Sequence, residues 1–288
     1  MRGSRVASDK VQLYTTDMKL LGLVLGLFLA TPAHAQLAAA VLPLARNVQV
    51  GRPATVFATI INASSATAHG CTIAPITSVP GSFLYQTTDP KTNQLTGTPN
   101  TPVNIGPGGA QTFLLSFTVT AEFSNTVFLN FDCADTTPAQ NVVAVNTLSL
   151  TVVNRPVDDV IPIAATPTND GIVDIPGLNG TGVFAIAAVN IGNGGICCML
   201  HADTAAPNVT LSICQTDPAN ATCLQPPVQG LLRWNSAPGQ PATFSVFAKG
   251  SGNVPFNPAT NRIYVTFKDF ALFFPDLGLT GVAVRTRP

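Results

Sequence analysis

Ile-Gly-Pro-Gly-Gly-Ala-Gln-Thr-Phe-Leu-Leu-Ser-Phe, residues 105–117, is the stretch from which the fold of this chain is inferred. It begins with a Pro-Gly-Gly turn. The larger apolar residues then fall on alternate positions: Phe113, Leu115, Phe117 and Val119. Alternation with a period of two is typical of a β-strand that buries one face. The stretch therefore predicts a turn followed by a half-buried strand.

A similar phrase returns later in the chain. Residues 238–244 read Pro-Gly-Gln-Pro-Ala-Thr-Phe, and Val246 and Ala248 continue the apolar alternation. Upstream of each copy stands the tripeptide Thr-Asp-Pro, at residues 88–90 and 216–218. These paired phrases indicate that one β unit is written twice.

Other segments also occur in pairs. Thr55–Asn62 corresponds to Gly182–Asn190, and both are rich in residues that favour strands and end in Asn. Val127–Phe131 corresponds to Ile263–Phe267. No window shows helical periodicity, and 24 prolines and 23 glycines punctuate the chain. About seven short strands per unit predict an antiparallel sandwich.

The predicted fold is all-β, with two tandem immunoglobulin-like antiparallel β-sandwich domains after a signal peptide. We place the N-terminal extension and signal peptide at residues 1–35, the first sandwich at 36–154 and the second at 155–288. Residues 154–159 are short, polar and contain Pro156, which predicts a tight linker.

The N-terminal region resembles a secretory leader. Lys19 precedes the apolar run Leu20–Ala30, and Ala33-His34-Ala35 provides small residues at a cleavage site. A membrane anchor is the alternative, but the run is short for a bilayer. We expect cleavage near Ala35 and export to the periplasm, the cell surface or the medium. No later segment is long and apolar enough to cross a membrane.

Two phrases resemble a known kind of module. Phe57–Asn62 and Ile105–Phe113 are similar to the pattern of bacterial cell-surface Ig-like repeats of the CARDB and DUF11 kind. The second unit departs from this pattern at Gln240-Pro241, where the first has Gly109-Ala110, but both phrases make a turn. The resemblance covers both units and implies an exported β-sandwich that serves as a spacer, an adhesion module or an appendage. It implies no site residues.

All six cysteines lie after the predicted cleavage site, and an even number in an exported chain favours disulfides. Cys214 and Cys223 flank a short turn-rich loop whose ends must approach, so we expect them to pair. Cys71 follows the second strand and Cys133 ends the penultimate strand. Bridges between these regions of the two sheets are known in this architecture, so we also expect Cys71 to pair with Cys133.

Cys197 and Cys198 are adjacent, and they occupy the place of Cys71 in the second copy. The corresponding partner position lies near Asp269, which leaves no long-range partner. Three readings stay open: a vicinal bridge, two reduced thiols, or a link to another chain. An alternative function is a copper-like metal-binding or redox protein that uses Cys197, Cys198, Met199 and His201.

Composition narrows the remaining chemistry. Fourteen basic and fourteen acidic residues give zero net charge, and no basic patch supports nucleic-acid binding. After the predicted cleavage site the chain has two histidines, His69 and His201, and one glutamate, Glu122. These are few residues for acid–base catalysis. No Gly-x-Ser-x-Gly motif is present. A hydrolase would therefore need a pocket that joins a histidine with a carboxylate. No cofactor is expected, although Asp170 and Asp174 offer oxygen ligands for calcium.

Two surface features are candidates for binding a partner. An apolar loop before Asp276 contains Phe270, Leu272, Phe273 and Phe274, and Arg233 precedes the only tryptophan, Trp234. Packing against the rest of the chain is the alternative for both. The sequence favours a non-enzymatic binding or structural module for an unknown protein or cell-surface partner, such as one that serves in adhesion.

Overall fold

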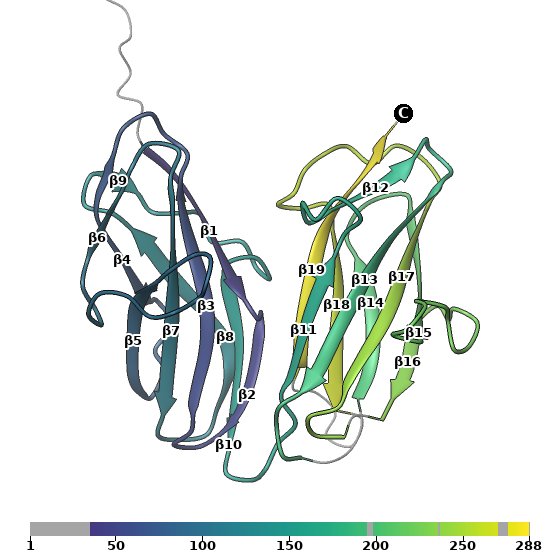
Figure 1. The fold of residues 1–288 in the computed structure, drawn as a ribbon, viewed down its shortest axis with the longest axis horizontal. Helices are drawn as coiled ribbons and strands as arrows, with labels where there is room; N and C mark the ends of the chain where they lie inside the picture. The colour runs from purple at the N-terminus through teal and green to yellow at the C-terminus, as the bar shows by residue number, and fades with distance from the viewer. Residues whose placement is uncertain (1–34, 195–197, 236, 270–275, 288) are drawn as a thin grey trace, which may run out of the picture. The chain divides into compact units, whose positions relative to one another are not determined.

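The structure is a computed structural model of the 288-residue chain, and it describes residues 35–194, 198–235, 237–269 and 276–287. All regular secondary structure in these ranges is β-strand, and none is helix (Figure 1). The predicted all-β class is confirmed. The sheets and their buried faces are consistent with β-sandwiches.

The first half of the described chain, residues 35–153, contains two five-stranded sheets. The strand orders are β5-β7-β3-β1-β9 and β2-β10-β8-β4-β6. Their bounds are β1 Ala35–Leu42, β2 Ala45–Gln49, β3 Pro53–Asn62, β4 Ala68–Pro75, β5 Gly81–Thr88, β6 Val103–Ile105, β7 Ala110–Val119, β8 Phe123–Asp132, β9 Thr136–Thr137 and β10 Thr147–Val153.

The second half, residues 160–287, contains one four-stranded and one five-stranded sheet. The strand orders are β11-β13-β17-β15 and β12-β19-β18-β14-β16. Their bounds are β11 Val160–Ala165, β12 Ile172–Pro176, β13 Thr181–Asn190, β14 Cys198–Thr204, β15 Val209–Thr216, β16 Leu231–Trp234, β17 Pro241–Gly250, β18 Arg262–Asp269 and β19 Asp276–Arg287.

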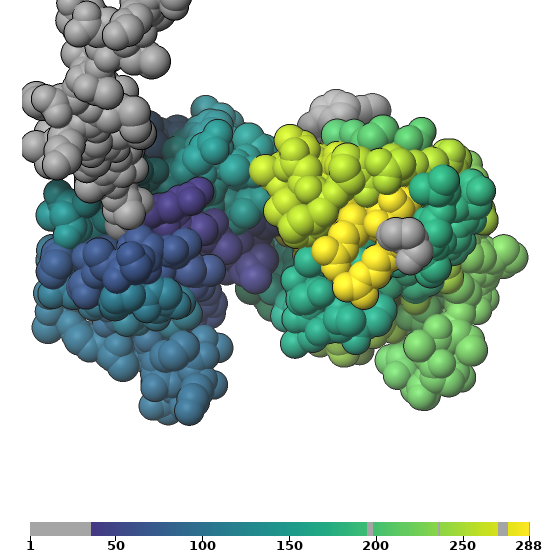
Figure 2. Space-filling view, turned by 90° about the horizontal axis from the view of Figure 1, so that it is seen from above, coloured from purple at the N-terminus to yellow at the C-terminus, as the bar shows by residue number. Residues whose placement is uncertain are grey.

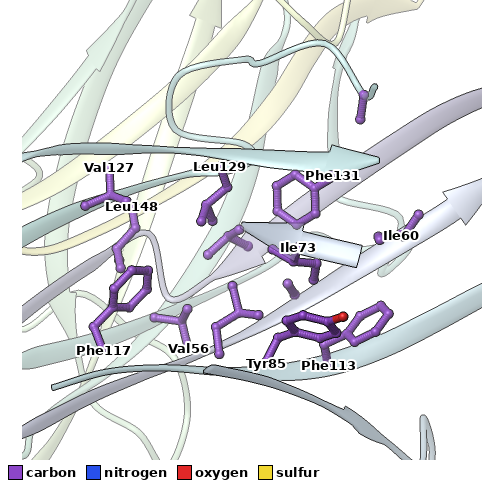
Figure 3. Packing of buried hydrophobic residues seen from close by; sticks show 14 of the residues in the cluster. Val56, Ile60, Ile73, Tyr85, Phe113, Phe117, Val127, Leu129, Phe131 and Leu148 are labelled. Carbon is purple, nitrogen blue, oxygen red and sulfur yellow. The ribbon is translucent and has the colours of Figure 1, made fainter. Parts of the chain in front are cut away.

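The strand predicted from residues 105–117 is β7, in which every second residue from Phe113 to Val119 is buried. Those side chains and the buried residues of β3 meet residues from β8 and β10 in a single hydrophobic cluster. Figure 3 shows Val127, Leu129 and Phe131 of β8 pointing toward side chains of β3, β5 and β7. Burial of one face of each sheet supplies the main favourable free energy of this half.

A second hydrophobic cluster fills the second half. At its centre the rings of Trp234, Phe244 and Phe267 contact one another edge to face, with centroids 5.5–5.8 Å apart. This is a favourable geometry for aromatic quadrupoles, and each such pair adds about 0.5–1.5 kcal/mol beyond area burial.

Both Pro-Gly turns need glycine at the same place. Gly108 and Gly239 adopt φ angles of 62° and 76°, in the left-handed region that glycine enters without penalty. Each turn is closed by a backbone hydrogen bond, from Gly109 to Gly106 O in the first copy and from Gln240 to Ala237 O in the second. The sequence phrase therefore specifies the turn, and the turn starts the central strands β7 and β17.

The two strand-ending asparagines are fully buried. Asn62 donates through Nδ2 to the carbonyls of Ala66 and Ile105, at 2.7 and 3.0 Å, and accepts through Oδ1 from the amide of Ser64. Asn190 holds the equivalent place at the end of β13. A buried carbonyl without a partner is costly, so these side chains satisfy loop backbone that leaves the sheets.

The disulfides Cys71–Cys133 and Cys214–Cys223 are both present, which confirms the two predicted pairs. Cys71 on β4 lies beside the end of β8 and joins neighbouring strands of one sheet. The prediction that it would bridge the two sheets was therefore wrong. In the second half Cys198 lies opposite Asp269 in register, which is the partner position inferred from the sequence.

The two Thr-Asp-Pro phrases form similar loops after β5 and β15, and both loops protrude from the surface in Figure 2, in blue and light green. Backbone bridges close them, from Thr88 to Leu95 and from Thr216 to Cys223. Where the second loop has Cys214, the first has Gln86, whose Nε2 donates to the carbonyl of Gly97 at 3.0 Å. A side-chain hydrogen bond and a disulfide therefore tether corresponding loops.

Truncation of Phe244 tests the second core. Phe244 is fully buried, so we expect Phe244→Ala to lower the free energy of unfolding by about 3–5 kcal/mol. Phe247, on the same strand but facing outward, provides the matched control, and Phe247→Ala should cost less than about 1.5 kcal/mol. Urea unfolding measures both, and equal losses would show that the assignment of the two faces of β17 is wrong.

Candidate functional site

Among the described residues, the most deeply buried ion pair joins Arg46 on β2 to Asp159 in the segment before β11. Their side chains are only 8% and 4% exposed. Nε and Nη2 of Arg46 donate to Oδ2 of Asp159 at 3.0 and 2.9 Å, and the amide of Asn47 donates to Oδ1 at 3.1 Å. Arg46 Nη1 donates to the carbonyl of Thr55. The pair is thus saturated by hydrogen bonds, which a buried ion pair requires.

Two opposing influences act on the pKa of Asp159. Burial raises its pKa, because the charged form loses solvation, and the positive charge of Arg46 opposes that rise. The hydrogen bonds from Arg46 and from the Asn47 amide act in the same direction as that charge. These contacts favour the carboxylate form of Asp159 beside the guanidinium.

The segment that carries Asp159 is cradled by the turn after β13. Asn190 Oδ1 accepts from the amide of Asp159 at 3.0 Å, and its Nδ2 donates to Asp158 Oδ1 at 2.7 Å. A Cβ placed on Gly192 would lie 2.2 Å from the carbonyl oxygen of Val157. No side chain fits at such a distance, so glycine at position 192 allows the two backbones to approach.

A cleft of about 370 Å³ opens beside this pair, within the size range of small-ligand sites. It is lined by Arg46, Asn47, Val48, Gln49, Arg52, Pro156, Val157, Asp159, Ile191, Gly192 and Asn193. None of these is Ser, Thr, Cys or His, so the lining supplies neither an ordinary nucleophile nor an imidazole base. Its one carboxylate is engaged by Arg46. The cleft can offer hydrogen bonds and the Arg52 guanidinium, but no catalytic set.

The candidate contact residues on β16 lie in different settings. Trp234 is 5% exposed and belongs to the second core, which agrees with the alternative of packing within the chain. The physical reason is strand alternation, which sends Trp234 inward and its neighbour Arg233 outward. The apolar loop residues Phe270, Leu272, Phe273 and Phe274 lie outside the described residues.

The described sulfur and imidazole groups of the proposed metal site lie on both faces of β14. Cys198 and Leu200 of β14 are buried, whereas Met199 and His201 lie on the opposite face of the strand. Alternate residues of a strand point to opposite sides, so Cys198 cannot share a metal ion with its two neighbours. Cys197 lies outside the described residues. Of the four proposed ligands, the described part of β14 therefore separates Cys198 from Met199 and His201.

The two aspartates proposed for calcium are used otherwise. Asp174, on β12, accepts a hydrogen bond from Arg285 Nε at 2.7 Å and lies 3.2 Å from Arg287 Nη1. Asp170 accepts at Oδ1 from the amide of Ile172 at 2.9 Å, in a tight turn. Two arginines against one carboxylate oppose a cation there. Among the described residues, no group of three His, Cys, Asp or Glu side chains could hold a metal ion.

An exposed histidine–carboxylate pair was not foreseen from the sequence. His69 Nδ1 lies 2.6 Å from Asp135 Oδ2, and the His69 amide donates to Oδ1 at 2.8 Å. These hydrogen bonds lower the pKa of Asp135. No hydroxyl or thiol of the described chain forms a hydrogen bond with this ring, so the pair lacks the nucleophile of a catalytic triad.

In the ranges that the structure covers, we find no helix with the length and apolar character needed to cross a membrane.

Comparison with known proteins leaves the family open. No family model matches the chain, and no curated protein matches it. A solved family 123 glycoside hydrolase from Clostridium perfringens shares 9% identity at a TM-score of 0.30, over 49% of this chain and 30% of that one. The secreted serine protease VesC from Vibrio cholerae shares 11% at 0.23, over 75% and 48%. The chain thus spans less than half of either protein, and similarity this low carries no functional argument.

Removal of one partner tests the role of the buried ion pair. Asp159→Ala leaves the Arg46 guanidinium buried without its carboxylate, so we expect the free energy of unfolding to fall by about 3–5 kcal/mol. The double variant Arg46→Met, Asp159→Leu removes both charges and should recover most of that loss. Urea unfolding of the single and double variants measures the difference. A double variant as unstable as Asp159→Ala would contradict the pairing.

The pKa of Asp135 tests the exposed pair. Because its pKa is lowered in the folded protein, the interaction stabilises the fold above the ordinary carboxyl pKa of 3.8 and is lost as pH falls through the lowered value. His69→Ala should move the Asp135 pKa up toward 3.8, as followed by NMR of the carboxyl carbon. Asp89, whose pKa is lowered chiefly by the amides of Thr92 and Lys91, should not change. An unmoved Asp135 would rule out the imidazole as its partner.

Proposed function

We propose that this protein is an exported, non-enzymatic binding or structural module of the periplasm or cell surface. In this proposal it consists of two tandem Ig-like β-sandwiches, similar to CARDB and DUF11 modules, joined at residues 154–159. Its partner is a protein or another component of the cell surface.

The observation that carries the proposal is the use of the polar side chains. Arg46 is engaged by Asp159, Asp174 by two arginines, and Asn62 and Asn190 by loop backbone. Groups that could perform chemistry are thereby committed to holding loops and the segment between the halves. The outward faces of the sheets and the protruding loops then provide the surface that a partner can contact.

Export is supported by the two disulfides, since such bonds form and persist in oxidising compartments. The leader-like sequence before Gln36 agrees with this setting. Only 10% of the residues are charged, so the polar surface depends on uncharged residues such as threonine, serine and asparagine.

Replacement of the apolar loop at residues 270–275, a candidate contact from the sequence, tests the proposal. We expect the purified exported protein to capture a saturable component of its native envelope, and a variant with 270–275 replaced by Gly and Ser to lose that capture. Cooperative unfolding of the variant, followed by circular dichroism, is the control for folding. Unaltered capture would remove this loop from the contact surface, and absence of any saturable component would refute the binding role.

A further inference from the structure

The outward face of the sheet β5-β7-β3-β1 is uncharged. The outward residues of its central strand β3 are Pro53, Thr55, Phe57, Thr59 and Ile61. The outward positions of β1, β7 and β5 that lie opposite or beside them in register are Ala, Thr, Ser, Leu or Gln, and none is Asp, Glu, Lys or Arg. A partner that covers this face would therefore desolvate no charge.

Large apolar side chains stand at the middle of this face. Leu42, Phe57 and Leu114 lie side by side in the register of β1, β3 and β7. Leu42 is 57% exposed, Phe57 40% and Ile61, at the end of the same strand, 42%. Aromatic residues near the centre and depletion of charge are the features that mark the core of protein interfaces.

The corresponding sheet of the second half has a different arrangement of outward side chains. Counting back from the equivalent asparagines Asn62 and Asn190 places Ala185 where the first half has Phe57. The outward face of β17 carries an aromatic residue, Phe247, opposite Val183, and beside it a charge, Lys249. The second face is therefore also partly apolar, and the first differs from it in having no charge and in placing its aromatic residue on β3.

The size of the face fits a symmetric contact. Four strands spaced about 4.8 Å apart and about nine residues long cover roughly 600 Å², so two such faces bury about 1,200 Å². That value is at the lower end of stable protein interfaces. After residue 35 the chain has 10 basic and 12 acidic residues, so the exported product has a net charge of only −2 and long-range repulsion between copies is weak.

We propose that the occupant of this face is a second copy of this chain. The two copies pair the uncharged faces of their β5-β7-β3-β1 sheets about a two-fold axis, with Phe57 and Leu42 at the centre. An isologous contact of this kind closes on itself and produces a dimer. This inference rests on the proposed function, because it names the partner of the binding module.

The test measures mass in solution. The full chain is expressed with its own leader, the exported product is purified, and mass spectrometry identifies its N-terminus. Sedimentation equilibrium should then show a dimer of the intact product at protein concentrations up to about 100 µM. Phe57→Lys places two like charges at the centre of the contact and should weaken association at least ~100-fold.

The matched control is Phe128→Lys. Phe128 is 36% exposed and points outward from β8, in the other sheet of the same half, so this variant should remain as dimeric as the wild type. Near-ultraviolet circular dichroism of both variants verifies that packing is retained. If Phe57→Lys does not fold, Leu42→Lys replaces it at the neighbouring exposed position.

Three results would overturn the dimer: a monomeric wild-type protein, association unaffected by Phe57→Lys, or equal loss in Phe128→Lys. Neutral phosphatidylcholine vesicles provide a separate arm. Binding of monomeric wild-type protein to these vesicles, lost in Phe57→Lys, would assign the face to lipid and refute the dimer. A monomer that still captures a saturable envelope component would refute the dimer and leave the proposed function intact.

Discussion

Each half of this protein depends on one constraint: its central strands bury one face and leave the other outside. The alternation in β3 and β7, and in β13 and β17, sends every second side chain into a shared hydrophobic cluster. Because the strands that alternate are adjacent in register, the buried residues form continuous layers. The turns, the buried asparagines Asn62 and Asn190, and the disulfides all stabilise loops where the chain leaves the strands.

Charged residues are scarce in this chain, and some of them have structural roles. With few charged residues available, one arginine and one aspartate are buried together and hold the segment before β11 against β2. The fold tolerates these two buried charges only as a pair, since either one alone would be a buried unpaired charge that destabilises the protein. The cleft beside them therefore reflects the packing of this segment, and its lining gives no sign of a catalytic set.

The two halves show how a repeated β unit is secured by different chemistry. Gln86 and Cys214 occupy corresponding positions, yet one tethers its loop by a hydrogen bond and the other by a covalent bond. Cys133 and Asp269 also correspond. In the first half Cys133 forms a disulfide with Cys71, whereas in the second half Asp269 lies opposite Cys198. The outward faces differ as well, through Phe57 and Ala185. Function is expected to follow such differences because the shared residues maintain the common core.

The sequence by itself determined the local features of this protein. The period-two alternation and strand-favouring residues predicted β3, β7, β13 and β17, and the Pro-Gly phrases predicted the turns before β7 and β17. These signals are local, since they depend on backbone preference and on residues two apart. Both disulfide pairs were also predicted, Cys214–Cys223 from the short loop between them and Cys71–Cys133 from bridges known in this architecture, although the latter joins strands of one sheet and not the two sheets.

Only the tertiary structure decided which side chains meet. Nothing near Arg46 in the sequence points to Asp159, which is 113 residues away, and the same holds for His69 and Asp135. Residues close in sequence can also lie apart: Cys198 is next to Met199, but strand alternation places it on the face opposite Met199 and His201. For Trp234 the sequence left a binding surface and core packing open, and its position on β16 places it in the core. Contacts between distant strands depend on register and sheet order, which no single stretch of this chain encodes.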